Sequence, residues 1–105
     1  MNMRHFYAGT FINRKDLKKV GIEYPIKLEY YKTKIDHNIT NNEAFGIEIV
    51  KTAYTQDETK TETANISELT RDETIINRIL DTLRKNEVTP ISANEVVEDL
   101  LKAME

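Results

Sequence analysis

The sequence contains no cysteine, and only three glycines and two prolines stand among its 105 residues. Without cysteine the chain has no disulfide bond, no thiolate zinc site and no cysteine nucleophile, as is typical of a reducing compartment. No stretch approaches the roughly 20 apolar residues that are needed to cross a bilayer. The first residues also lack the apolar run of a signal peptide. We therefore expect a cytoplasmic protein that has no membrane segment.

Motifs of catalysis and of nucleotide binding are missing as well. The glycines are too far apart for a G-x-G-x-x-G fingerprint or a P-loop, and neither Ser67 nor Ser92 lies in a G-x-S-x-G elbow. The only histidines, His5 and His37, lack the partner that makes a helical metal pair. Asp36 beside His37 resembles an acid–base pair, but this Asn-rich stretch is typical of an exposed loop. We expect no enzyme activity, no cofactor and no metal, since an enzyme would need a site that no motif reveals.

Length and composition predict one small domain. A chain of 105 residues is long enough for one core and too short for two. Hydrophobic residues make up 39% and charged residues 31%, which suits a modest core under a charged surface. We assign residues 1–105 to a single domain, in which residues 1–23 are a flexible basic arm or an extra strand.

Charge is distributed unevenly along the chain, although the formal net charge is only −3. Residues 1–34 carry eight Lys or Arg against three Asp or Glu, whereas residues 35–105 carry seven against fifteen. The basic part can bind a polyanion, but charge complementarity within the molecule explains the division equally well. We favour the second interpretation.

An amphipathic helix is predicted over residues 70–85. Charged residues occupy one face of this segment and apolar residues recur at helical spacing on the other. The apolar set is Ile75, Ile76, Ile79, Leu80 and Leu83. Thr70 and Glu73 fit a T-x-x-E capping box, and Asn86 suits a left-handed residue at the end of the helix.

A second amphipathic helix is predicted after Pro90, which cannot continue the first. Its apolar residues have the same spacing and are Val96, Val97, Leu100, Leu101 and Met104. Ser92 and Glu95 form another capping box, and Ile91 can pack on Val96 as a hydrophobic staple.

Earlier in the chain the apolar period is two, which predicts strands. Residues 26–31 and residues 44–54 alternate in this way, and the polar residues 36–43 between them read as a loop joining an antiparallel pair. The Thr-rich residues 59–66 predict a third strand, which we place at an edge because it has few apolar side chains. Residues 6–12 are compatible with a short strand, and residues 16–20 with a helical turn.

These segments predict an α+β fold, a small antiparallel sheet of three to four strands packed against two C-terminal amphipathic helices. The helices each have one apolar stripe, and so does the sheet. The predicted core consists of Leu28, Tyr30, Phe45, Ile47, Ile49, Ile66, Ile75, Ile79, Leu80, Leu83, Val97, Leu100 and Leu101.

Several short segments also carry a resemblance to a known family. They are residues 28–31 (LEYY), 45–51 (FGIEIVK), 65–67 (NIS), and 86–90 (NEVTP), which leads into 96–100 (VVEDL). Through them residues 24–101 resemble a family of small uncharacterised bacterial proteins that is catalogued as domain of unknown function 6514. The resemblance implies a cytosolic bacterial protein with a strand-rich first part and a helical second part. It implies no activity, substrate or catalytic residue.

The missing chemistry favours a non-enzymatic module for protein interaction or regulation. Such a module would bind a protein partner, as yet unidentified, or a second copy of itself, through an exposed strand edge or through an acidic face of the last helix. The acidic face is formed by Glu95, Glu98 and Asp99, although a solvated face is the commoner role of such residues.

Nucleic-acid binding through the basic first part of the chain is the alternative hypothesis. Basic side chains would follow the phosphates while the aromatic rings stack on bases. The residues concerned are Arg14, Lys15, Lys18 and Lys19 with Phe6 and Phe11. The competing interpretation is that the rings belong to the core and the basic side chains are solvated, and we favour it.

Overall fold

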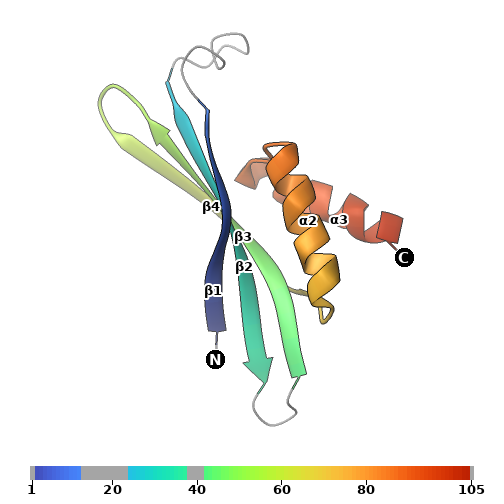
Figure 1. The fold of residues 1–105 in the computed structure, drawn as a ribbon. Coiled ribbons are helices and arrows are strands. Elements are labelled where there is room, and N and C mark those ends of the chain that lie inside the picture. Colours follow the sequence, from blue (N-terminus) through green and yellow to red (C-terminus); the bar gives the residue numbers. More distant parts are fainter. Residues whose placement is uncertain (1, 13–23, 38–41, 105) are drawn as a thin grey trace.

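The computed structural model describes residues 2–12, 24–37 and 42–104, and confirms the predicted α+β class (Figure 1). Four strands come first along the described chain, and a 3-10 turn and two helices follow. In order they are β1 (Asn2–Ile12), β2 (Ile26–His37), β3 (Asn42–Tyr54), β4 (Thr59–Thr70), α2 (Glu73–Lys85), η1 (Pro90–Ser92) and α3 (Ala93–Met104). None of the described helices is long and apolar enough to cross a membrane.

The sheet is an antiparallel meander in which each strand pairs with the next, in the order β1-β2-β3-β4. The strands predicted around residues 26–31 and 44–54 are confirmed, and so is the edge position of the Thr-rich strand. The extra strand considered for residues 6–12 is present as β1. The helical turn considered for residues 16–20 lies outside the described residues.

The loop predicted over residues 36–43 is too long. Asp36 pairs with Glu43 and His37 with Asn42, so the β2–β3 ladder continues almost to the hairpin end. Backbone pairing does not require apolar side chains, because polar side chains on a projecting hairpin remain in water. Residues 38–41 lie outside the described part of the chain.

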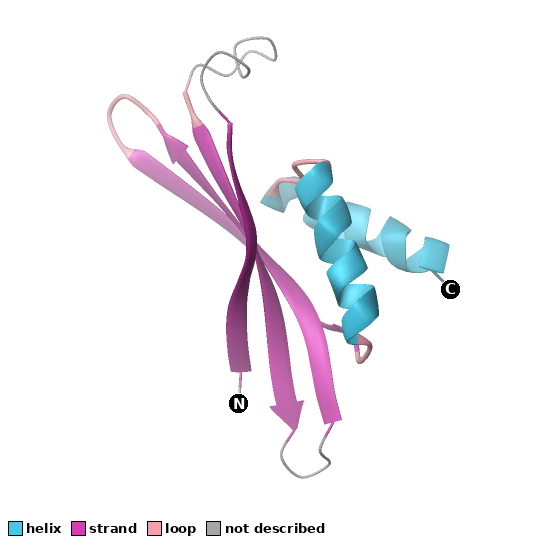
Figure 2. Cartoon of the chain, viewed as in Figure 1, coloured by secondary structure: helices cyan, strands magenta, loops and turns pink. Residues whose placement is uncertain are grey.

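The core lies between one face of the sheet and α2. Alternate residues of β2 and β3 and the apolar stripe of α2 meet there. Figure 2 shows the backbone arrangement, with the cyan helix α2 beside the magenta strands. Nine predicted core residues are buried: Leu28, Tyr30, Phe45, Ile47, Ile49, Ile79, Leu80, Leu83 and Val97. Four others are only partly buried: Ile66, Ile75, Leu100 and Leu101. For the last two the reason is the direction of α3, which extends away from the sheet towards the C-terminus (Figure 1).

The predicted N-cap of the first helix is wrong, whereas its predicted end is confirmed with Asn86 as the C-cap, although Asn86 is not left-handed. α2 begins at Glu73, and its N-cap is Asp72, whose carboxylate accepts a hydrogen bond of 2.9 Å from the backbone N–H of Thr74. Thr70 belongs to β4, and its hydroxyl accepts from the N–H of Asp72 within the turn. At the other end Asn86 has a φ of −95°, and the left-handed residue is Glu87 with a φ of 50°.

The second helix, α3, begins at Ala93, directly after the predicted cap Ser92, but the predicted hydrophobic staple is wrong. The chain enters α3 through η1, in which Pro90 is buried while Ile91 is 88% exposed. Ile91 therefore does not pack on Val96, because the tight turn directs its side chain into water. Tyr30 holds the segment between α2 and η1 directly, because its buried hydroxyl donates a hydrogen bond of 2.9 Å to the backbone oxygen of Val88.

Gly46 marks an irregularity between β3 and β4. The register shifts between Phe45 and Ile47, and on the opposite strand Glu68 has a φ of 54°. A Cβ at Gly46 would lie 2.3 Å from the backbone oxygen of Ile66. The backbones approach too closely there for any residue other than glycine.

Candidate functional site

The face of the sheet opposite the helices is open. Both helices lie on one side of the sheet in Figure 1, and no described element covers the other side. The strand registers place four side chains in a row across this open face, one from each strand. Phe6 lies opposite Tyr31, Tyr31 opposite Glu48, and Glu48 opposite Asn65.

This row is ordered by direct contacts. The guanidinium of Arg4 lies 4.1 Å from the centre of the Tyr31 ring and forms an ion pair with Glu48. The side-chain amide of Asn65 donates a hydrogen bond of 3.3 Å to the same carboxylate. Phe6 meets the edge of Tyr31 with 5.7 Å between the ring centres. Cation–π, ionic and aromatic contacts thus hold one surface in a defined arrangement.

Four aromatic rings are distributed over this open face. Phe11 contacts Tyr54 in a tilted arrangement with 6.2 Å between the ring centres, in addition to the edge-to-face pair of Phe6 and Tyr31. Phe6 and Phe11 are each 61% exposed, which is high for large apolar side chains in an ordered strand. We call Phe6, Phe11, Tyr31 and Tyr54 the aromatic face.

A bulge at Tyr7 brings the two phenylalanines to the same side of β1. The register with β2 shifts between Phe6 and Ala8, so Tyr7 is the extra residue and points towards α2 instead. Residues five positions apart in a regular strand face opposite sides. The bulge reverses this parity, and both phenylalanines reach the open face.

The nucleic-acid set predicted from sequence is only partly placed by the structure. Phe6 and Phe11 share the open face, whereas the four basic residues at positions 14, 15, 18 and 19 lie outside the described residues. The described cations of this face already have carboxylate neighbours. Arg4 pairs with Glu48, and Lys27 lies 3.7 Å from Glu29.

The acidic face predicted on the last helix is exposed. Glu95, Glu98 and Asp99 occupy neighbouring positions on α3, and all three side chains lie in water. No ion pair joins them to another residue in the part of the chain that the structure describes. The structure brings these carboxylates together but provides no enclosed site around them.

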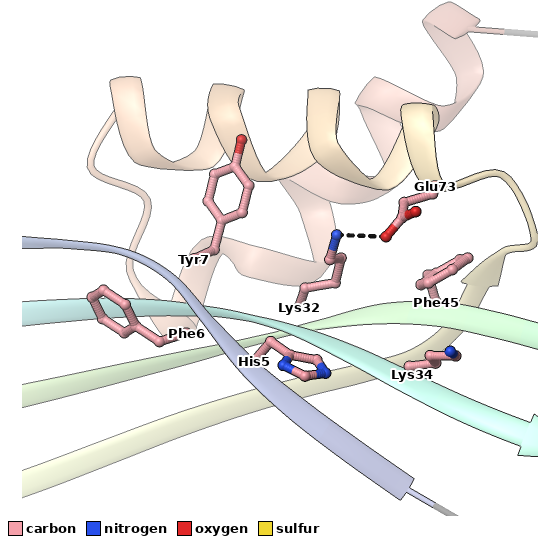
Figure 3. Close-up of a pocket in the computed structure, with 7 residues that line it drawn as sticks. All are labelled: His5, Phe6, Tyr7, Lys32, Lys34, Phe45 and Glu73. Atoms are coloured by element: carbon pink, nitrogen blue, oxygen red, sulfur yellow. Dashed lines mark hydrogen bonds and ion pairs between the residues drawn. The ribbon is translucent and has the colours of Figure 1, made fainter.

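A pocket of about 410 Å³ opens on the helix side of the sheet, beside the first turn of α2 (Figure 3). It is lined by His5, Phe6, Tyr7, Lys32, Lys34, Phe45 and Glu73. The Lys32 ammonium lies at its centre and donates hydrogen bonds to Glu73 at 2.8 Å and to Asn77 at 3.1 Å. The hydrogen bond from Lys32 lowers the pKa of the Glu73 carboxyl.

Other contacts of the pocket are also internal to the protein. Lys34 forms an ion pair of 2.9 Å with Glu43. Tyr7 donates a hydrogen bond of 2.8 Å to Asp81 on α2, which lowers the pKa of Asp81. Burial, with this hydrogen bond, raises the pKa of Tyr7. Each described ammonium of the pocket therefore has a carboxylate beside it, and the pocket walls are close to neutral.

The ion pairs give a structural meaning to the uneven charge of the sequence. Among the described residues, three of them join a cation of residues 1–34 to a carboxylate of residues 35–105. They are Arg4–Glu48, Lys32–Glu73 and Lys34–Glu43. This is the intramolecular complementarity that the sequence analysis favoured. Among the described residues no group of three His, Cys, Asp or Glu side chains is placed to hold a metal ion.

Sequence reasoning missed the row that contains Tyr31, Glu48 and Asn65. The two-residue period already put Tyr31 and Glu48 on the side of their strands opposite the core residues. Which outward residue meets which depends on strand register, and the period does not specify register.

Comparison with known proteins identifies a family. Residues 10–103 match a family described as a family of unknown function (DUF6514). No curated protein and no solved structure matches the chain.

Proposed function

Because the chain belongs to the DUF6514 family, whose function is unknown, we propose a function from the geometry: a non-enzymatic module that binds a protein through its aromatic face. The observation that carries this proposal is the exposure of Phe6 and Phe11 on a face that no described element covers. Ordered apolar patches with a polar rim mark interaction sites, and aromatic side chains supply much of the binding energy there.

The chemistry of the partner follows from the charges around the rings. Arg4 with Glu48 and Lys27 with Glu29 leave the open face close to neutral. A polyanion gains little from such a surface, whereas an apolar protein surface with a polar rim complements it. This favours a protein partner over the nucleic-acid alternative. The cysteine-free sequence supports a cytoplasmic location for this protein and its partner.

Photo-crosslinking in the native host tests this proposal. A photoreactive phenylalanine analogue is placed at Phe6 or Phe11, where an aromatic ring of similar shape already stands. The matched control carries it at Ile91, which is 88% exposed and belongs to η1 on the helix side. We expect protein adducts at positions 6 and 11 that are absent at position 91. Equal adducts at all three positions, or none, would contradict the proposal.

The acidic face of α3 is a separate surface of the same proposed module. Reversal of Glu95, Glu98 and Asp99 to lysine in the native host tests whether it contributes. A changed set of co-purifying partners would assign binding to this face. An identical set would remove the face from consideration and leave the aromatic face as the binding surface.

A further inference from the structure

The two edges of the sheet differ in how well they are protected from pairing. Edge strands present unpaired backbone groups, and charged residues and bulges normally block them. β4 has charged residues along its length, Lys60, Glu62 and Glu68, and Glu68 sits in its irregular segment at positive φ. β1 spans 11 residues and carries only one formal charge, that of Arg4. β1 also has a bulge, at Tyr7, so the two edges differ mainly in charge. The edge of β1 is the less charged template for another strand.

One antiparallel register of β1 with a second copy places each Phe6 opposite a Phe11, so that large apolar rings meet on the same face. Pairing is possible only between residues that face the same side of the sheet. Phe6, Gly9 and Phe11 face the open side, while Ala8 and Thr10 face the helices. In this register a two-fold axis passes between the Gly9 residues of the two copies, and Tyr7 stays unpaired as the extra residue of the bulge. Thr10 then lies opposite Ala8 of the second copy. Phe11 then lies opposite Phe6 of the second copy, and every pair matches in face.

We infer that a second copy of this chain pairs with β1 in antiparallel fashion about Gly9, which joins two sheets into one of eight strands. The inference rests on the proposed function, because it names the partner of the aromatic face. Two Phe6–Phe11 pairs form across the junction, one on each side of the axis. Residues 5–12 carry no formal charge, so no like charges meet at its centre.

The absence of cysteine makes a register-specific test possible. Opposite residues in an antiparallel pair have Cα atoms about 4.5 or 5.5 Å apart, within the span of a disulfide. An equimolar mixture of Phe6→Cys and Phe11→Cys proteins, one tagged to shift its mobility, is treated with a mild oxidant. We expect the mixed disulfide to form. The other Phe6–Phe11 pair of that dimer stays intact, so the substitutions do not remove the whole contact.

Each variant alone serves as the matched control. Two copies of position 6 are separated by about four residues, on the order of 13 Å at a rise of about 3.3 Å. Neither protein should therefore form a disulfide with itself. Thr63→Cys tests the other edge, since Thr63 lies on the open face of β4. Cross-linking at Thr63 that equals the mixed 6–11 product would overturn the inference.

Sedimentation equilibrium supplies an independent measurement on the whole chain. We expect a monomer–dimer equilibrium that Phe11→Glu weakens by more than about tenfold, because one substitution disrupts both symmetric ring pairs. Ile91→Glu, on the helix side, should leave the equilibrium unchanged. A wild-type chain that stays monomeric up to millimolar concentration would overturn the inference. Photo-adducts with a different protein at positions 6 and 11 would then still support the proposed function, which fails only if those adducts are missing.

Discussion

Gly46→Ala should destabilise the protein by about 1 to 3 kcal/mol, the usual cost of forcing extra volume into a packed site. The methyl group would lie 2.3 Å from the backbone oxygen of Ile66, 2.7 Å from the Cα of Ser67 and 2.8 Å from the hydroxyl of Thr33. Ordinary carbon contacts lie near 3.5 to 4.0 Å, so the nearest atoms must move by about 1 Å or more. Two of them are backbone atoms of β4 and have no rotamer to relieve the clash.

Gly9→Ala is the matched control because it places the same methyl group in an ordinary part of the sheet. Its nearest neighbour would be the tip of the Phe6 ring at 3.2 Å, which a small rotation relieves. Alanine also removes some of the entropy that glycine loses in a strand, so we expect a change within about 0.5 kcal/mol.

Urea unfolding followed by far-ultraviolet circular dichroism measures both variants against the wild type. The reasoning predicts a clearly lower midpoint for Gly46→Ala and an unchanged one for Gly9→Ala. Hydrogen exchange adds a local readout, since the clash should weaken amide protection first in β4 near Ile66. If the free energy of unfolding of Gly46→Ala lies within about 0.5 kcal/mol of the wild-type value, the close approach of β3 and β4 at that point is wrong.

The remaining predictions concern the core, the pocket and nucleic acid. Ile79→Ala should lower the free energy of unfolding by about 2 to 5 kcal/mol in urea melts, because the side chain is fully buried. A loss below about half a kcal/mol would mean that this face of α2 does not pack in the core. Tyr30→Phe should cost about 1 to 3 kcal/mol by leaving the buried oxygen of Val88 without its donor; a neutral result would mean that water replaces it. Lys32 lowers the pKa of Glu73, so the stability from their pair is fully present above the ordinary carboxyl pKa of 4.5 and is lost as the pH falls through the lower folded value. The difference in urea midpoint between the wild type and Lys32→Met should therefore shrink on acidification, and a difference that is constant from about pH 7 to pH 3 refutes the assignment. Random single- or double-stranded oligonucleotides should give no measurable complex at physiological salt, whereas a micromolar complex that weakens steeply with salt would revive the nucleic-acid hypothesis.

Local pattern alone determined much of the fold. The two-residue period located the middle of β2 and β3, the 3.6-residue period located α2, and the low apolar content of residues 59–66 identified β4 as an edge strand. These features depend on which side chains must leave water together, and neighbouring residues already encode that.

Helix ends and the outer half of α3 were decided by tertiary contacts. Thr70 and Asp72 lie two positions apart, and both are residue types that commonly cap helices. Because β4 extends to Thr70, Asp72 is the residue that caps α2. Leu100 has the same helical spacing as buried residues, yet it is half-buried because α3 extends away from the sheet towards the C-terminus. Sequence spacing specifies which face of a helix is apolar but not the angle at which the helix packs.

The candidate site depended most on tertiary structure. The sequence by itself placed Phe6 and Phe11 in a basic, aromatic segment, and only the bulge at Tyr7 turned both rings to the same open face. Likewise the sequence showed a basic first part and an acidic second part, and the strand register decided that Arg4 meets Glu48 over the Tyr31 ring. The physical reason is that alternation is a property of one strand, whereas bulges and register belong to a pair of strands and are set by the best joint packing of the whole sheet.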